Sequence, residues 1–422
     1  MPSQLSNFCC ITMGQSPKGD ECNSSGIGHP LLNGPTEFQL IHPSPVQWTT
    51  NPKKFSKSGD LLFCVRGSTT GRMNWSDQIY AIGRGLASIS PLHEDTIYFF
   101  RGAVEVYLPS LLAGATGSTF PNVSRSDLES IPIPHSDLKY IKSASSILRS
   151  LERKIELNQK MNQTLEEIAE TIFKSWFVDF DPVRAKAEGR PTGLPPEISD
   201  LFPDELVDSE IGEVPKGWEV KTISDLADCV GGATPSTKNP EFWEGGKHTW
   251  TSPKDLSDSK SIHLLKTDRK ITEAGLKKIS SGLLPVGTVL LSSRAPVGYL
   301  ALTTEPTAIN QGYIALKPKS GISNYFLLHW CESNLDEIKN RASGTTFAEI
   351  SKAAFRPIPA IEPSKSAMEK FHQFVSPIYQ RVLVASKEME TLAELRDTLL
   401  PKLISGELRI HDAEKFLEEA GL

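Results

Sequence analysis

The chain has 422 residues, of which 38% are hydrophobic, and a formal net charge of −6. This length allows two or three domains, each with its own core. No apolar run approaches the about 20 residues that a membrane-spanning helix needs. The first ten residues lack the charged and apolar regions of a secretory signal. Six cysteines in a chain of this length favour a reducing compartment, so we expect a cytoplasmic protein.

The charge is distributed unevenly along the chain. Residues 1–142 are neutral, residues 143–213 carry −7, residues 214–365 carry +4 and residues 366–422 carry −3. The net negative charge by itself argues weakly against nucleic-acid binding. Because the acidic residues are concentrated in the helical and linker regions, the sign of the whole chain is a poor guide to what the globular parts bind.

The first globular part is expected over residues 1–142. Short apolar runs separated by Gly and Pro, such as Asp60–Val65 and Ile97–Phe100, are typical of strands with polar loops and some short helices. The sequence Ile131-Pro-Ile-Pro134 ends this part, since residues before Pro avoid the helical region.

A long amphipathic helix is predicted next, over Ser146–Phe180 within a region assigned to residues 143–180. It has no Pro or Gly, and its apolar residues recur at heptad a and d positions: Leu148, Leu151, Ile155, Leu165, Ile172 and Trp176. A helix of about 33 residues would be roughly 50 Å long. The Pro-rich, acidic stretch 181–213 is interpreted as a linker, either flexible or ordered by its contacts.

A second globular part is expected over residues 214–365, again rich in strands and ending at Arg356-Pro-Ile-Pro359. Residues 366–422 form the second helical region and the C-terminal tail. Its helix is predicted from about Ala367 to Leu400, with a possible kink at Pro401 and an end at Gly406.

The two halves repeat each other at an offset near 227 residues. Leu148 and Val375, Leu165 and Leu392, and Ile172 and Leu399 are each separated by 227. Outside the helices, the matching segments are Ser58–Arg66 with Val286–Arg294, Ala115–Phe120 with Ala342–Phe347, Ile131-Pro132 with Ile358-Pro359, and Gly14–Pro17 with Gly232–Pro235. We therefore predict an α+β fold of two similar mixed α/β domains separated by two long antiparallel coiled-coil helices, with an internal pseudo-two-fold repeat.

The sequence contains none of the common catalytic motifs. There is no phosphate-binding loop, dinucleotide fingerprint, H-E-x-x-H zinc motif or G-x-S-x-G elbow, and no His/Cys cluster with metal-ligand spacing. The Asn/Asp-Pro-Pro-aromatic tetrapeptide of amino-methyltransferases is also missing. We therefore predict a non-catalytic protein with no cofactor and no metal.

Polar residues in the shared loops are the candidates for DNA contact. An Arg beside Gly-flanked hydroxyls after a strand could bind phosphate, but the same sequence also fits a β-turn with a solvated Arg. Asn310-Gln311-Gly312 could read an adenine edge or form a turn. The candidate DNA-binding residues are Arg66, Ser68, Arg72, Arg84, Lys254, Arg294, Asn310, Gln311 and Thr345.

The first helix raises two further questions. Asn158 and Asn162 fall on d and a positions, where a buried Asn costs stability but fixes register and partner. Near its end, large aromatic residues exceed the needs of a two-helix seam. We expect these aromatics to pack against the globular parts or to dock a partner subunit: Phe173, Trp176, Phe177 and Phe180.

Three long motifs resemble the specificity subunits of type I restriction-modification systems. Leu157–Phe180 with Asp181–Arg184 resembles the central conserved region of that family. Val214–Glu219 is similar to the entry into its second target recognition domain, and Leu395–Leu408 resembles its distal conserved region. The resemblance covers almost the full chain, although the Pro-x-Gly-Trp entry at Pro215–Trp218 has no N-terminal copy.

The resemblance implies that each target recognition domain reads one half of a bipartite, asymmetric double-stranded DNA site. The two helices would set the gap between the half-sites and dock two methyltransferase subunits, which carry S-adenosylmethionine and the adenine-N6 chemistry. Restriction subunits would join that core. The alternative is a non-catalytic coiled-coil scaffold whose globular parts bind proteins or small molecules. A self-sufficient methyltransferase is disfavoured by the missing motifs.

Overall fold

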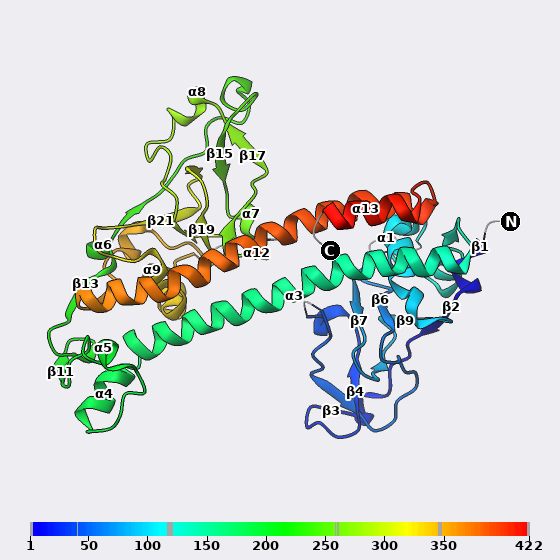
Figure 1. Cartoon of the computed structure of the whole chain (residues 1–422), viewed down its shortest axis with the longest axis horizontal. Helices are drawn as coiled ribbons and strands as arrows, with labels where there is room; N and C mark the ends of the chain where they lie inside the picture. Colours follow the sequence, from blue (N-terminus) through cyan, green and yellow to red (C-terminus); the bar gives the residue numbers. More distant parts are fainter. Residues whose placement is uncertain are drawn as a thin grey trace. The chain divides into compact units, whose positions relative to one another are not determined.

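The computed structural model describes residues 3–39, 41–115, 121–257, 259, 261–344 and 348–419. The chain divides into two units. Unit 1 comprises Met1–Asn158 and Glu388–Leu422, and unit 2 comprises Gln159–Lys387. Two long helices, α3 (Leu138–Phe177) and α12 (Lys365–Ser405), contribute one half each to both units (Figure 1).

The β-rich part of unit 1 contains two small sheets. The first has the order β2-β9-β6-β7 and is antiparallel, with strands Cys9–Met13, Leu86–Pro91, Leu61–Cys64 and Met73–Trp75. The second has the order β3-β5-β4-β8, with strands Cys22–Asn23, Gln47–Thr49, His29–Leu32 and Ala81–Ile82. A separate pair joins β1 (Ser3–Gln4) to β10 (Pro132–Ile133).

Unit 1 contains further helices besides its halves of the long helices. They are α1 (Ile97–Gly114), α2 (Arg125–Glu129), α13 (Ile410–Glu419) and the short 3-10 helices η1 (Leu5–Asn7), η2 (Gly19–Glu21), η3 (Pro35–Glu37) and η4 (Glu94–Thr96). One core joins this sheet, α1 and the unit 1 halves of α3 and α12 through residues such as Phe63, Phe100, Leu148 and Leu399.

In the described residues, the first sheet of unit 2 has the strand order of its unit 1 counterpart with β16 (His263–Leu264) added at one edge, whereas the second sheet has three strands instead of four. Its first sheet is β14-β21-β18-β19-β16, with strands Ala227–Val230, Tyr313–Pro318, Val289–Ser292, Leu300–Thr303 and His263–Leu264. Its second sheet is β17-β15-β20, with strands Arg269–Ile271, His248–Thr251 and Thr307–Ile309. Two further pairs are β11–β12 (Leu206–Ser209, Gly212–Pro215) and β13–β22 (Glu219–Thr222, Pro359–Glu362).

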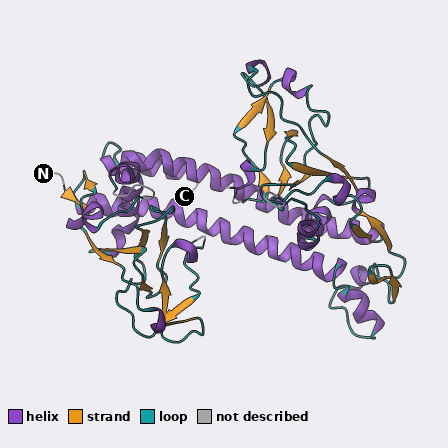
Figure 2. Ribbon diagram, turned by 180° about the vertical axis from the view of Figure 1, so that it is seen from behind, coloured by secondary structure: helices purple, strands orange, loops and turns teal. Residues whose placement is uncertain are grey.

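Short helices complete unit 2 (Figure 2). They are α4 (Asp181–Ala187), α5 (Pro196–Ser199), α6 (Ile223–Leu226), α7 (Lys254–Ser257), α8 (Glu273–Leu276), α9 (Asn324–Ser333), α10 (Leu335–Asn340), α11 (Lys352–Phe355) and the 3-10 helix η5 (Pro240–Phe242). The expected linker is thus ordered: Val183, Ile198 and Phe202 belong to the hydrophobic core of unit 2.

The repeat expected from the sequence is confirmed by packing details. Gly71 lies against the side chain of Leu108, and Gly298 lies against that of Leu335. Both the glycines and the leucines are 227 residues apart. Gly14 approaches the carbonyl oxygens of Ile82 and Gly83, while Gly232 approaches that of Ile309. A Cβ atom at Gly232 would lie 1.8 Å from this oxygen, so the backbone contact itself requires glycine.

The long helices run antiparallel within each unit. In unit 1, Asn158 donates a hydrogen bond to Glu388 (2.8 Å), and the Tyr140 hydroxyl donates to the Leu403 carbonyl (2.9 Å). In unit 2, Asn162 donates to the Ser386 hydroxyl (3.1 Å), whereas the ring of Trp176 meets that of Phe371. Residues further along α3 therefore meet residues earlier along α12.

The helix limits differ from the expected ones in two places. Helix α3 starts at Leu138, eight residues before Ser146, because the stretch after Pro134 already buries Ile141 and Ala144. Helix α12 continues past Pro401 to Ser405 and ends at Gly406, whose φ of 77° suits a glycine. None of the helices in the described ranges is long and apolar enough to cross a bilayer.

Candidate nucleic-acid interface

In each unit three loops meet where the strands of the first sheet begin or end, along one side of that sheet. In unit 1 they are residues 14–17, 65–72 and 83–85, which we call loop edge 1. In unit 2 they are residues 232–235, 293–298 and 310–312, which we call loop edge 2. The Val65 amide donates to the Gly85 carbonyl at 2.9 Å, and the corresponding Ser293 amide donates to Gly312 at 2.8 Å. The same backbone frame therefore holds both edges.

The first and third loops are also joined in the same way. The Gln15 amide donates to the Ile82 carbonyl at 2.9 Å, and the Ala233 amide donates to that of Ile309 at 3.1 Å. The side chains on this frame differ between the units. At the tip of the third loop, Arg84 is exposed in unit 1, and Gln311 is exposed in unit 2.

A hydroxyl group of the first loop contacts the tip of the third loop in each unit, but it contacts the backbone in unit 1 and a side chain in unit 2. The Ser16 hydroxyl accepts a hydrogen bond from the Arg84 amide at 3.1 Å. The Thr234 hydroxyl donates to the Gln311 side-chain oxygen at 2.7 Å. The exposed guanidinium group of Arg84 thus makes no hydrogen bond or ion pair with the described residues, whereas the side-chain oxygen of Gln311 already accepts a hydrogen bond. The two edges offer different hydrogen-bonding groups at equivalent places.

Asn310 takes part in its own turn. Its side-chain oxygen accepts from the Gly312 amide at 2.8 Å. A bidentate contact with adenine needs both the oxygen and the nitrogen of the amide. The geometry therefore favours the turn interpretation for Asn310 over direct base reading in this conformation.

The second loop carries three of the candidate residues in unit 1. Arg66, Ser68 and Arg72 are exposed on the turn between β6 and β7. Gly67 and Gly71, with φ of 95° and 96°, give this turn its shape. Because Arg66 and Arg72 flank the turn, their guanidinium groups are available for phosphate contact.

The remaining candidate residues of unit 2 are spread over three segments. Arg294 is half-buried and lies 3.6 Å from the Glu349 carboxylate. Lys254 starts α7, outside loop edge 2, and pairs with Asp268 at 2.9 Å. Thr345 lies outside the described residues. The structure thus brings Arg294, Asn310 and Gln311 together, but it does not bring Lys254 to the same edge.

The four aromatic residues at the end of α3 lie in the core of unit 2. Phe173, Trp176, Phe177 and Phe180 are only 2–6% exposed. Their rings contact Phe326, Phe371, Phe202 and Trp218. Of the two roles expected from the sequence, packing against the globular part is the one observed. Their burial removes them from direct contact with a partner, so we do not retain the docking role for these side chains.

Asn158 and Asn162 face the seam between the long helices. They are 3% and 6% exposed, and their side-chain nitrogens donate to Glu388 and Ser386. The side-chain oxygen of Asn162 has no hydrogen-bond partner among the described residues. Ser386 also accepts from the Ser261 hydroxyl at 3.0 Å, so this polar site links the seam to the β-rich part of unit 2.

An aromatic and cationic stack in unit 2 was not identified from the sequence. The Arg269 guanidinium lies 3.6 Å from the centre of the Trp243 ring, and Trp243 packs edge-on against Trp250. The exposed Lys270 follows on the same strand, β17. The signal was the composition of residues 235–285, which have nine Lys or Arg against six Asp or Glu.

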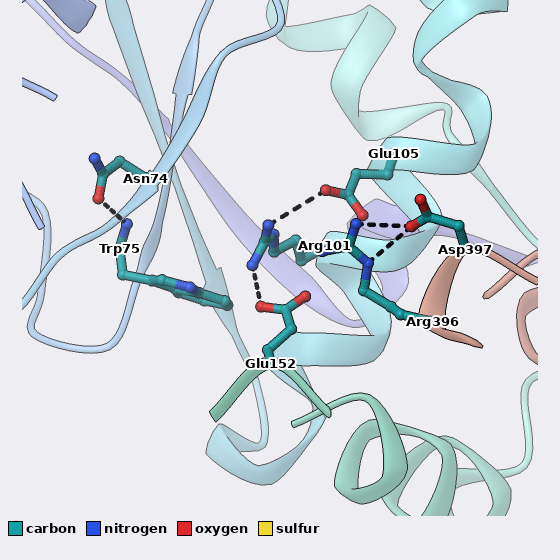
Figure 3. A network of polar contacts seen from close by, with 7 residues as sticks. All are labelled: Asn74, Trp75, Arg101, Glu105, Glu152, Arg396 and Asp397. Carbon is teal, nitrogen blue, oxygen red and sulfur yellow. Dashed lines mark hydrogen bonds and ion pairs between the residues drawn. The ribbon is translucent and has the colours of Figure 1, made fainter. Parts of the chain in front are cut away.

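A polar network in unit 1 was also missed (Figure 3). Arg101 on α1 forms ion pairs with Glu152 on α3 and with Glu105, the latter at 3.3 Å. Arg396 on α12 pairs with Asp397 at 2.7 Å. Burial raises the pKa of Glu152, although the Arg101 charge acts in the opposite direction. The Arg101–Glu152 pair joins α1 to α3, and the Arg396 charge also acts to lower the pKa of Glu152.

A polar cleft of unit 1 lies between its β-rich part and α3. It has a volume of about 840 Å³. Arg149, Arg153 and Lys57 line it together with acidic residues that include Asp60, Asp77 and Glu156. Its mixed charge does not favour a polyanion. Among the described residues, no group of three His, Cys, Asp or Glu side chains has the arrangement of a metal site.

The comparisons with known proteins agree with the repeat. Residues 2–167 and 215–392 each match the family described as the type I restriction modification DNA specificity domain. The chain is 29% identical over 415 residues to the type I restriction enzyme HindI specificity subunit of Haemophilus influenzae, covering 84% of this chain and 88% of that protein. It is 34% identical over 193 residues to the MjaIX specificity subunit of Methanocaldococcus jannaschii, covering 45% of this chain and 44% of that protein.

A solved structure shows the same fold. The S subunit of a type I restriction-modification system from M. genitalium superposes with a TM-score of 0.61, at 16% identity, over 96% of this chain and 95% of that one. The two family matches together cover well over half of the chain. The repeated frame and the two matched regions show that this chain belongs to the family of type I restriction-modification specificity subunits.

Proposed function

We propose that this chain is the DNA sequence-specificity subunit of a type I restriction-modification complex. In this proposal each β-rich part reads one half of a bipartite double-stranded DNA site. The observation that carries it is the pair of loop edges: one backbone frame, held by equivalent hydrogen bonds, presents different side chains in the two units. A repeated frame with different side chains suits the reading of an asymmetric site, because each half can then specify its own bases.

The long helices have a separate role in this proposal. They set the gap between the half-sites and dock two methyltransferase subunits, and restriction subunits join the complex thereafter. The residues that dock the methyltransferase belong to the outer faces of α3 and α12, because the seam-facing residues are buried. The chain itself supplies specificity and assembly, while the adenine-N6 chemistry belongs to the methyltransferase subunits.

Methylome sequencing tests this function directly. A host lacking its own methylation is made to express the chain together with the methyltransferase subunit that accompanies it. We expect adenine methylation at a split motif with a fixed gap. If the two proteins co-purify but no split motif appears, the specificity role is contradicted. That outcome would favour the alternative of a scaffold whose globular parts bind proteins or small molecules.

A further inference from the structure

The second sheet of unit 2 carries an arginine whose charged group is held in place but not neutralised. The guanidinium group of Arg269 on β17 lies over the Trp243 ring at 3.6 Å from its centre, and 5.8 Å from the centre of the Trp250 ring. It makes no hydrogen bond or ion pair with the described residues, and the neighbouring Asp268 already pairs with Lys254 at 2.9 Å. Two aromatic rings therefore support a guanidinium group whose five N–H donors no described residue occupies.

This aromatic support is bound to loop edge 2. The Trp250 indole N–H donates to the Ala233 carbonyl at 3.2 Å. The Trp243 indole N–H donates at 3.1 Å to the carbonyl of Ser236, the residue that follows the first loop of this edge. Both rings under Arg269 are thus fixed by the backbone of one short segment, so the position of the guanidinium group is coupled to that of the loop edge.

The strand register also places Arg269 at this edge. Arg269 lies opposite Trp250 on the neighbouring strand β15. Strand β15 ends one residue later, at Thr251, whose carbonyl accepts a hydrogen bond from the Asn310 amide at 3.0 Å. Because Asn310 begins the third loop of loop edge 2, Arg269 belongs to the same end of the second sheet as that edge, although none of its three loops contains it.

The equivalent position of unit 1 carries a different polar group. The parallel partners of Leu32 on β4 and of Thr251 on β15 are 227 residues apart, so these two positions match. The residue before each of them lies opposite Gln47 in unit 1 and opposite Arg269 in unit 2. Gln47 is exposed, and its side-chain oxygen accepts from the side-chain nitrogen of Asn33 at 2.9 Å. A position that differs in this way between two copies of one frame suits the distinction of two half-sites.

We propose that Arg269 reads a guanine base in the half-site bound by unit 2, an inference that rests on the proposed function. Two N–H groups of the guanidinium would bind O6 and N7 of guanine in the major groove, which is the commonest specific contact between arginine and DNA. Such a bidentate contact requires a guanidinium plane of fixed orientation, and the tryptophan support restricts that orientation. A contact with phosphate demands less of the orientation, and exposed lysines without such a support, such as Lys270, can supply it.

Methylome sequencing of variants co-expressed with the methyltransferase subunit tests the inference. One half of the split motif of the parent chain should contain a G·C pair at which Arg269→Ala reduces the preference for guanine about tenfold or more. Arg269→Lys should reduce it as well, because an ammonium group keeps the charge but cannot form the bidentate contact. The other half of the motif should stay unchanged in both variants, which also shows that each variant is folded.

Lys270→Ala is the matched control. It removes one positive charge from the next residue of β17, whose side chain points to the opposite face of the strand. Any loss of DNA affinity should therefore be uniform across sequences, and the base preference in both halves of the motif should stay as in the parent chain.

A binding measurement follows the contact itself. The complex of the chain with the methyltransferase subunit is titrated with a fluorescent duplex that carries the parent motif, and anisotropy reports the affinity. Replacement of the guanine by 7-deazaguanine removes the N7 acceptor and should weaken binding of the parent complex about fivefold or more. The same replacement should change the affinity of the Arg269→Ala complex by less than about twofold, because the donor to N7 is already missing.

Four results would overturn the inference while leaving the proposed function intact. They are a parent motif without a G·C pair, an unchanged motif with Arg269→Ala, a loss that is uniform across sequences, as a phosphate contact would give, and an equal effect of 7-deazaguanine on the parent and variant complexes. A parent complex that assembles but yields no split motif would instead contradict the proposed function, and the inference with it.

Discussion

Replacement of Arg101 by leucine, the residue at the equivalent position of unit 2, tests the energetics of the unit 1 network. The Arg101 and Glu152 side chains are 20% and 14% exposed. Removal of one partner from a buried ion pair typically costs about 3–5 kcal/mol, because the remaining charge stays buried. Arg396 still stabilises Glu152, so we expect Arg101→Leu to lower the free energy of unfolding by about 2–3 kcal/mol near neutral pH.

The cost should depend on pH in a defined direction. Burial already raises the pKa of Glu152, and Arg101 opposes this increase. Without Arg101 the pKa of Glu152 in the folded state rises further above its unfolded value. A carboxyl group with a raised folded pKa destabilises the protein as the pH rises through that value, so the cost should shrink as the pH is lowered toward the unfolded value of about 4.3.

Urea unfolding, combined with hydrogen exchange of peptides from α1 and α3, provides the measurement. The matched control is Arg125→Leu, which breaks the exposed Arg125–Glu129 pair and should cost less than about 1 kcal/mol. In the double variant Arg101→Leu/Glu152→Leu, most of the loss should disappear. The reasoning is refuted if Arg101→Leu costs no more than the control, or if the second substitution restores nothing.

Three further predictions concern local packing and charge. Gly14→Ala should destabilise unit 1 by more than about 2 kcal/mol in urea unfolding, because its Cβ would lie 2.1 Å from the Gly83 carbonyl oxygen, whereas Gly19→Ala meets nothing within 4 Å and should be nearly neutral. Asn162→Leu should raise the stability of unit 2 by about 1 kcal/mol, since it removes a buried unpaired oxygen; a loss of stability would show that the oxygen is satisfied in solution. Glu166→Gln should stabilise the protein by about 2 kcal/mol above pH 7 and by little at pH 4.5, because the folded-state pKa is raised from 4.5 to about 7; identical pH profiles for the variant and the parent chain would contradict this assignment.

Much of the fold could be predicted because matching motifs recur at a nearly constant spacing along the chain. The 227-residue offset aligned the helices, and glycine motifs at Gly14 and Gly232 marked backbone contacts that any side chain would block. Heptad positions also placed Asn158 and Asn162 at the seam, where the structure has them. The early start of α3 was missed because burial of Ile141 and Ala144 depends on tertiary packing.

The candidate site was less predictable because it depends on which loops, separate in the sequence, the fold brings together. The sequence identified Arg66 and Arg294 within their turns, but only the folded backbone joins these turns to those carrying Arg84 and Gln311. Large aromatic residues such as Trp176 and Phe177 suggested packing against a globular part or a partner surface, and the ordered linker and α9 bury them. An amphipathic pattern indicates that a face is apolar, but it does not tell whether the same chain covers that face.

The central claim is that each copy of the frame reads its own half of the DNA site. Methylome sequencing of Arg84→Ala and Gln311→Ala, each co-expressed with the methyltransferase subunit, tests it most directly. The exposed Arg125→Ala in unit 1 is the control. We predict that each loop-edge variant relaxes the base preference in one half of the split motif only, and that Arg84 and Gln311 affect opposite halves. Changes in both halves from one substitution, or in the same half from both, would contradict the account.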